Sequence, residues 1–114
     1  MIRRAYLAGP MRGYPSYNFP AFDRARDLLA SQGFIVISPA DMDRLYEGWG
    51  EAPPEGIEFT PDECARFIRR DLEVLLTLTP EIDAIYMLRG WETSKGARAE
   101  KAVAEFRGLE VLYE

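Results

Sequence analysis

Short apolar runs alternate along the chain with longer stretches in which apolar residues recur every three or four positions. The short runs have the length and large side chains of buried strands. They cover residues 2–8, 34–37, 84–88 and 109–113. The longer stretches begin near Asn18, at Thr60 and at Lys95, and their spacing predicts amphipathic helices. The clearest helix start is Thr60-Pro-Asp-Glu63, because Thr and Glu three positions apart form a capping box.

One segment shows neither the short apolar runs of strands nor the apolar spacing of helices. Residues 44–59 are rich in turn residues and predict a long loop, preceded by a turn over residues 40–43 that follows the end of a strand. Long loops in compact domains are often lids or binding loops. Trp49 within it offers a surface for stacking or an anchor for the loop, and the sequence favours neither.

The order of these segments predicts a single α/β domain over residues 1–114. We expect a small doubly wound, Rossmann- or flavodoxin-like parallel sheet of about four strands, in the order 2-1-3-4, with helices on both faces. Such a sheet binds ligands where the strand order reverses, between the first and third strands. The segments that follow these two strands, residues 9–13 and 89–95, are therefore expected to face one crevice.

Composition limits the classes of function. The chain has 114 residues, of which 47% are hydrophobic and 29% charged, as in an ordinary soluble globular domain. Its net charge of −5 disfavours nucleic acid and anionic membranes as partners but leaves room for a small anion. We find no apolar stretch near the length of a membrane span and no signal peptide, and we expect a cytoplasmic protein.

The chain contains no histidine and a single cysteine, Cys64. Catalysis by Ser-His-Asp or Cys-His groups is thereby excluded, as are zinc sites with histidine ligands and intramolecular disulfides. We expect no metal and no other cofactor. Carboxylates are the expected acids, bases and nucleophiles.

The loop after the first strand is a candidate binding segment. It consists of Gly9, Pro10, Met11, Arg12 and Gly13. Its glycines permit a ligand to approach the backbone, and Arg12 can clamp a phosphate or a carboxylate. A simple connection between a strand and a helix explains the same residues.

A second candidate lies where the last helix begins, at Ser94, Lys95 and Gly96. The free backbone N–H groups of a helix start bind anions. Lys95 is unfavourable beside the positive end of the helix dipole unless it shares an anion there. This segment is predicted to hold a phosphate.

Two acidic residues are candidates for chemistry. Glu100 has no helical neighbour that can pair with a carboxylate, and Gly96 and Ala97 leave space beside it. The alternative is an exposed glutamate on a charged helix face. Asp71 lies at the edge of the apolar face of its helix, where it either meets solvent or points into a cleft.

Three segments taken together resemble the nucleoside 2-deoxyribosyltransferase superfamily. They are Tyr6–Gly13, Arg70–Leu72 and Ser94–Glu100, and the resemblance extends over nearly the whole chain. It is strongest to a small uncharacterised branch found in bacteria and phages. Ser94 and the Arg12-Gly13 pair resemble deoxynucleoside 5′-monophosphate N-glycosidases more than the base-exchanging transferases, which have an aspartate in place of Ser94.

The resemblance implies roles for individual residues. It implies that Glu100 attacks the anomeric carbon, that Asp71 assists at the base and that Tyr6 positions the carboxylate. It further implies that the first loop and Ser94 hold the 5′-phosphate. The expected reaction is cleavage or transfer at the N-glycosidic bond of a (deoxy)nucleoside 5′-monophosphate, by a homodimer whose partner is a small-molecule nucleotide or nucleoside.

Lys95, Arg98, Trp91 and the middle loop depart from the pattern of these hydrolases, which leaves the substrate open. A non-catalytic nucleotide-binding or sensor module of the same fold is the main alternative, because fold does not fix function. A hydrolase of a larger nucleotide such as NAD is a third possibility.

Overall fold

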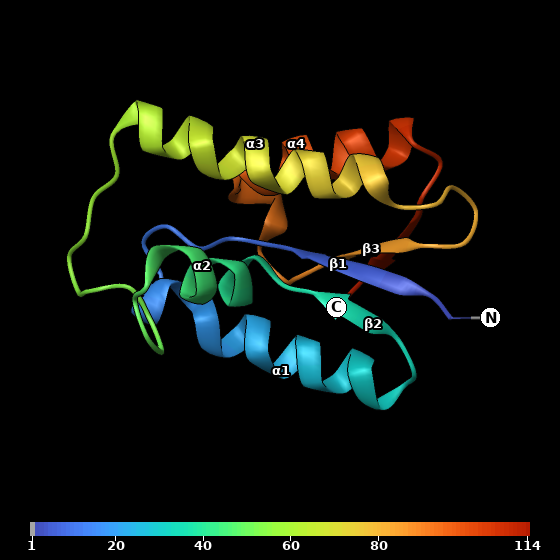
Figure 1. Cartoon of the computed structure of the whole chain (residues 1–114), viewed down its shortest axis with the longest axis horizontal. Helices are drawn as coiled ribbons and strands as arrows, with labels where there is room; N and C mark the ends of the chain where they lie inside the picture. The colour runs from blue at the N-terminus through green and yellow to red at the C-terminus, as the bar shows by residue number, and fades with distance from the viewer. Residues whose placement is uncertain (1) are drawn as a thin grey trace.

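A four-stranded parallel sheet divides the computed structural model, which describes residues 2–114, into two helical layers (Figure 1). The strands are β1 (Arg4–Ala8), β2 (Ile35–Ile37), β3 (Ala84–Met87) and β4 (Glu110–Tyr113). Their order is β2-β1-β3-β4, and each neighbouring pair is parallel. The predicted α/β fold and strand order are confirmed.

The helices cover both faces of the sheet. They are α1 (Phe19–Ser31), α2 (Pro39–Glu47), α3 (Pro61–Thr77) and α4 (Lys95–Phe106), with short 3-10 turns η1 (Pro15–Asn18) and η2 (Trp91–Thr93). In Figure 1, α1 lies below the sheet, and α3 and α4 lie above it. The short helix α2 follows β2 and contacts both layers, through Arg26 of α1 and Arg70 of α3. No helix within residues 2–114 is long and apolar enough to cross a bilayer.

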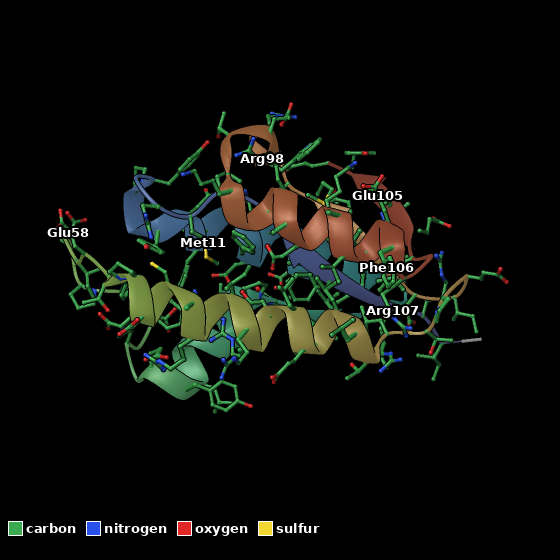
Figure 2. The ribbon with its side chains drawn as sticks, turned by 90° about the horizontal axis from the view of Figure 1, so that it is seen from above. Met11, Glu58, Arg98, Glu105, Phe106 and Arg107 are labelled. Atoms are coloured by element: carbon green, nitrogen blue, oxygen red, sulfur yellow. The ribbon has the colours of Figure 1, made fainter. Side chains whose placement is uncertain are left out.

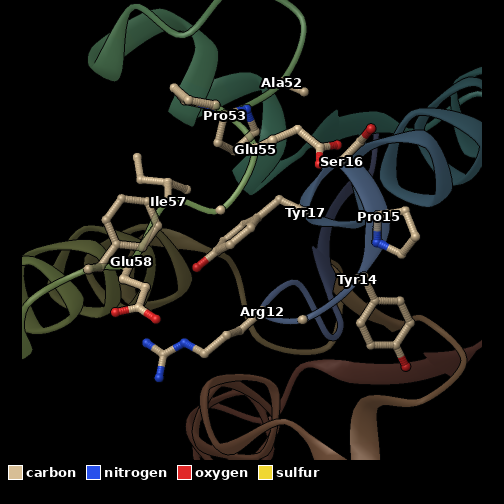
Figure 3. A pocket seen from close by; sticks show the side chains of 14 residues that line it. Arg12, Tyr14, Pro15, Ser16, Tyr17, Ala52, Pro53, Glu55, Ile57 and Glu58 are labelled. Carbon is tan, nitrogen blue, oxygen red and sulfur yellow. The ribbon is translucent and has the colours of Figure 1, made fainter.

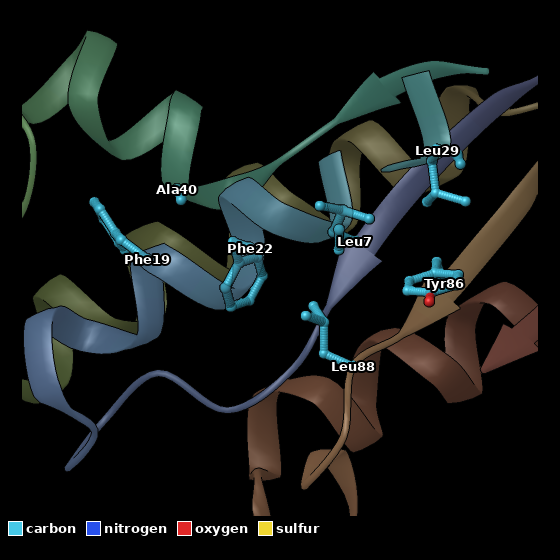
Figure 4. Close-up of a cluster of buried hydrophobic side chains, with 9 residues drawn as sticks. Leu7, Phe19, Phe22, Leu29, Ala40, Tyr86 and Leu88 are labelled. Atoms are coloured by element: carbon cyan, nitrogen blue, oxygen red, sulfur yellow. The ribbon is translucent and has the colours of Figure 1, made fainter. Parts of the chain in front are cut away.

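Each face of the sheet has its own apolar core. The core on the α1 face is built mainly around Leu7, Phe19, Phe22, Leu29, Tyr86 and Leu88 (Figure 4). The core on the other face is built around Tyr6, Ala8, Leu75, Ile85, Met87, Ala97 and Ala104. Because side chains alternate along a strand, Leu7 points to one core and its neighbour Tyr6 to the other. This alternation turns Tyr6 toward α3 and α4.

The sequence predicts a turn over residues 40–43 and a loop over 44–59. This prediction is wrong for residues 40–47. Residues 39–47 form α2, which begins with Pro39 in its first turn and ends at Gly48 in a left-handed conformation. Pro39 favours a helix start, and Asp41 near the amino end agrees with the helix dipole. The irregular segment therefore starts only at Gly48.

Gly9 lies where the ends of β1 and β3 approach each other. A methyl group added there would lie 2.7 Å from Cβ of Leu88, which is closer than carbon atoms pack. The glycine therefore serves the packing of the two strands, and the prediction that it opens the backbone to a ligand is not supported.

We expect Gly9→Ala to lower the free energy of unfolding by about 1–3 kcal/mol, the usual cost of overpacking a core. Urea denaturation measures the change. Gly96→Ala is the control, because a methyl group there would meet nothing nearer than 4.0 Å and alanine favours a helix. Equal losses in the two variants would contradict this interpretation of Gly9.

Candidate functional site

Three polar side chains meet under α3 and α4, which lie side by side over the sheet (Figure 2). They belong to Tyr6 on β1, Asp71 on α3 and Glu100 on α4, and as whole residues these are 0%, 9% and 5% exposed. The Tyr6 hydroxyl donates a hydrogen bond to Oε2 of Glu100. Asp71 lies near enough for its charge to raise the pKa of both Tyr6 and Glu100. The structure thus brings together the three residues predicted to be catalytic.

Helical spacing explains why both carboxyl groups are buried. Glu100 lies three residues after Ala97 and four before Ala104, which are both in the core, and therefore shares their face of α4. Asp71 lies four residues before the buried Leu75 and shares its face of α3. The alternatives of an exposed Glu100 and of an Asp71 at the solvent boundary are wrong.

Two residues that the sequence analysis did not select complete the cluster. Nε and Nη2 of Arg70 donate to Oδ1 of Asp71 at 3.0 and 2.9 Å. Nη1 of the same guanidinium lies 2.8 Å from Oδ1 of Asp43, which is 5% exposed. The only sequence signal for Asp43 was its place just after the end of β2.

The surroundings of these carboxyl groups favour their protonated forms. Burial raises the pKa of Glu100 well above its ordinary value, and the charge of Asp71 raises it further. Burial also raises the pKa of Asp71, while the charge and hydrogen bonds of Arg70 act against that rise. Burial raises the pKa of Asp43 to about 6. One guanidinium thus contacts two of these three buried carboxyl groups, so the cluster retains protons toward neutral pH.

The hydroxyl of Tyr6 has a single proton to donate. That proton goes to Glu100, where the hydrogen bond favours the ionised carboxylate against the effect of burial, whereas burial favours the protonated form of Asp71. A nucleophilic carboxylate and a neighbouring acid require this distribution.

The start of α4 lies about one and a half turns before Glu100. Oγ of Ser94 accepts a hydrogen bond from the backbone N–H of Ala97 at 3.1 Å and so caps the helix. Gly96 leaves space, because a methyl group added there would meet only Ile68 and Ser94, each at 4.0 Å. Lys95 is exposed. Ser94 occupies the N–H of Ala97, so within residues 2–114 the backbone N–H groups of Lys95 and Gly96 remain available to an anion.

The residues of the first loop divide into two groups. Pro10 is buried and Met11 packs against the core on the α1 face, so neither is free to bind a ligand. Arg12 and Gly13 line a groove of about 910 Å³ between residues 12–17 and 52–59 (Figure 3). Nη2 of Arg12 lies 2.8 Å from Sγ of Cys64. Within residues 2–114, the lining of this groove includes neither Ser94 nor the carboxyl groups of the cluster.

The ring of Trp49 anchors the irregular segment that forms one wall of this groove. It stacks on Phe59 with ring centres 5.4 Å apart, and Phe59 meets Phe67 of α3 edge to face at 4.9 Å. The segment is therefore held to the helix that carries Asp71 by aromatic contacts.

No group of three or more His, Cys, Asp or Glu residues within residues 2–114 is arranged to hold a metal ion. Among known proteins, the model of the family described as "Domain of unknown function (DUF4406)" matches residues 3–113. No curated protein matches the chain. The family match spans all four strands and both helical layers, and its description assigns no activity.

Proposed function

We propose that this chain, which belongs to the DUF4406 family, cleaves or transfers the N-glycosidic bond of a (deoxy)nucleoside 5′-monophosphate with Glu100 as nucleophile. The observation that carries the proposal is the burial of Glu100 against Tyr6 and Asp71. Burying carboxyl groups opposes folding by several kcal/mol per charge when they ionise. Groups held in this way are concentrated at functional sites.

The chemistry uses only groups of this chain. A carboxylate oxygen of Glu100 forms a bond to the anomeric carbon while the N-glycosidic bond breaks through an oxocarbenium-like state. The electron pair of the broken bond goes to the base nitrogen, and Asp71 donates a proton to the departing base. Water, or a second base in a transfer reaction, then attacks the anomeric carbon and gives a proton to the Asp71 carboxylate. The bond to Glu100 breaks, and Glu100 leaves as a carboxylate.

The phosphate supplies the positioning. Backbone N–H groups at the start of α4, close to Ser94 and Gly96, would hold its oxygens. Holding the phosphate there would fix the sugar near Glu100 and lower the entropic part of the barrier. The resemblance to the monophosphate N-glycosidases supports the same assignment, and it extends the proposal to a homodimer.

Incubation with each of the common deoxynucleoside 5′-monophosphates, followed by chromatography, tests the proposal. We expect free base from at least one monophosphate. The matching nucleoside, which lacks the phosphate that orients it, should react at least about tenfold more slowly. No base from any monophosphate would overturn the enzymatic proposal. Binding of a monophosphate without product, measured by calorimetry, would favour a non-catalytic binding module.

A further inference from the structure

Arg70 lies between two buried carboxyl groups, and only one of them, Asp71, has a part in the proposed reaction. We infer that Asp43 is a positioning residue, which shares the Arg70 guanidinium and thereby limits how strongly Arg70 holds Asp71 in its ionised form. The effect of Asp43 on base release rests on the proposed function. The coupling between Asp43 and Asp71 is measurable without any reaction.

The geometry of Arg70 carries the inference. Its Nε and Nη2 both donate to Oδ1 of Asp71, whereas Nη1 faces Oδ1 of Asp43 at 2.8 Å. The side chains of Arg70, Asp71 and Asp43 are only 20%, 12% and 8% exposed, so water screens their charges weakly. One cation of restricted position thus serves two anions on different helices.

The contact with Asp43 is not that of an ion pair optimised for stability. Oδ1 of Asp43 and Nη1 of Arg70 lack the alignment of a hydrogen bond, and neither atom has a hydrogen-bond partner elsewhere within residues 2–114. A buried pair contributes to stability only when its hydrogen bonds are well made. The electrostatic effect on Arg70 does not require that alignment, because it depends chiefly on distance.

Other charged and titratable groups near Asp43 are few. Asp71 and Arg70 face it from α3, Glu47 lies on its own helix, and Tyr17 lies in η1. Glu47 is itself paired with Arg66 at 2.7 Å. Arg70 is therefore the cation through which a change at Asp43 reaches the site.

The sign of the coupling follows from these charges. Burial raises the pKa of Asp71 and Arg70 acts against that rise. An ionised Asp43 draws on the charge of Arg70 and adds a negative charge near Asp71, and both effects weaken the opposing action of Arg70. Asp71 then retains the proton that it would give to the departing base. If Asp43 is made neutral, Arg70 acts on Asp71 alone and the pKa of Asp71 falls.

The test is an NMR titration of the Asp71 carboxyl carbon in the unmodified chain and in Asp43→Asn. We expect the midpoint of Asp71 to fall by about one pH unit in Asp43→Asn, the usual effect of a changed charge at such distances. Asp41→Asn is the matched control on α2, because Asp41 is 40% exposed and pairs with Arg26 and Arg44, and we expect it to leave the midpoint unchanged. In base-release assays, the alkaline limb of the pH profile should move to lower pH by a similar amount in Asp43→Asn alone.

An unchanged Asp71 midpoint in folded Asp43→Asn would overturn the inference. A shifted midpoint in a chain that releases no base would support the coupling and reject the proposed function. If Asp43→Asn does not fold, Arg70→Lys replaces it, since lysine keeps the charge but loses the fork that reaches both carboxyl groups. The midpoints of Asp43 and Asp71 should then both rise, and unchanged midpoints would overturn the inference.

Discussion

Glu100→Gln is expected to lower base release by about 10⁴-fold or more, as loss of a nucleophile does in other enzymes that form covalent intermediates. Glutamine preserves the shape of the side chain and an oxygen that accepts from Tyr6, but it cannot attack the anomeric carbon. Chromatography of released base measures the effect. Glu105→Gln is the control on the same helix, because Glu105 is 55% exposed and pairs only with Lys101 among the salt bridges of residues 2–114.

The same variant is expected to be as stable as the unmodified chain in acid and more stable near neutral pH. The pKa of Glu100 is raised in the fold, so its contribution to stability is fully present below 4.5, its ordinary value, and is lost as the pH rises through the folded value. Glutamine removes this pH dependence. Thermal unfolding of both proteins from pH 4 to pH 8 tests this difference in stability. Undiminished base release by folded Glu100→Gln would reject Glu100 as the nucleophile.

Asp83→Ala is expected to lower the free energy of unfolding by about 2–4 kcal/mol, because each buried donor left without an acceptor costs about 1–3 kcal/mol and two backbone N–H groups lose theirs. Asp83 is 2% exposed and lies just before β3. Its carboxylate accepts from the backbone N–H groups of Arg4 and Thr79 and from the Arg4 guanidinium, at 2.7 to 3.1 Å. The substitution leaves these donors without their acceptor at the point where β1 and β3 begin.

Denaturation in urea measures this loss, with Asp27→Ala as control because Asp27 is 73% exposed and its pairing with Arg26 is a surface contact. Burial alone would raise the pKa of Asp83, but the hydrogen bonds from Thr79 and Arg4 outweigh it and lower the pKa. The contribution of Asp83 is therefore present above 3.8, its ordinary value, and is lost as the pH falls through the lowered folded value. Equal losses for Asp83→Ala and Asp27→Ala would contradict this account.

The topology of the chain could be predicted from sequence because each strand and most helices have strong local signals. The capping box of Thr60 and Glu63, for example, is present as expected. The helix α2 was missed because the turn-rich residues after Gly48 suggested one irregular segment, although Pro39 in its first turn was a valid signal.

The site was predictable only in part. Helical neighbours selected Glu100 and Asp71 as candidates, and the resemblance added Tyr6. The burial of Glu100 depends on how α4 packs against α3 and the sheet, which helical spacing alone does not determine. The spacing of apolar residues in α3 predicts an exposed Arg70 on the charged side of the helix, but its side chain is only 20% exposed. Its burial depends on α2, because Asp43 can approach the guanidinium only from that helix.

The buried acid cluster has a practical consequence for any study of this protein in solution. Most proteins contain imidazole groups whose ionisation obscures other events near neutrality, and this chain has none. Ligand binding near neutral pH will therefore exchange protons mainly with the carboxyl groups between α2, α3 and α4. The α-amino group and the ligand itself are the other sources. Calorimetry in buffers of different ionisation heat would count those protons directly, without a label.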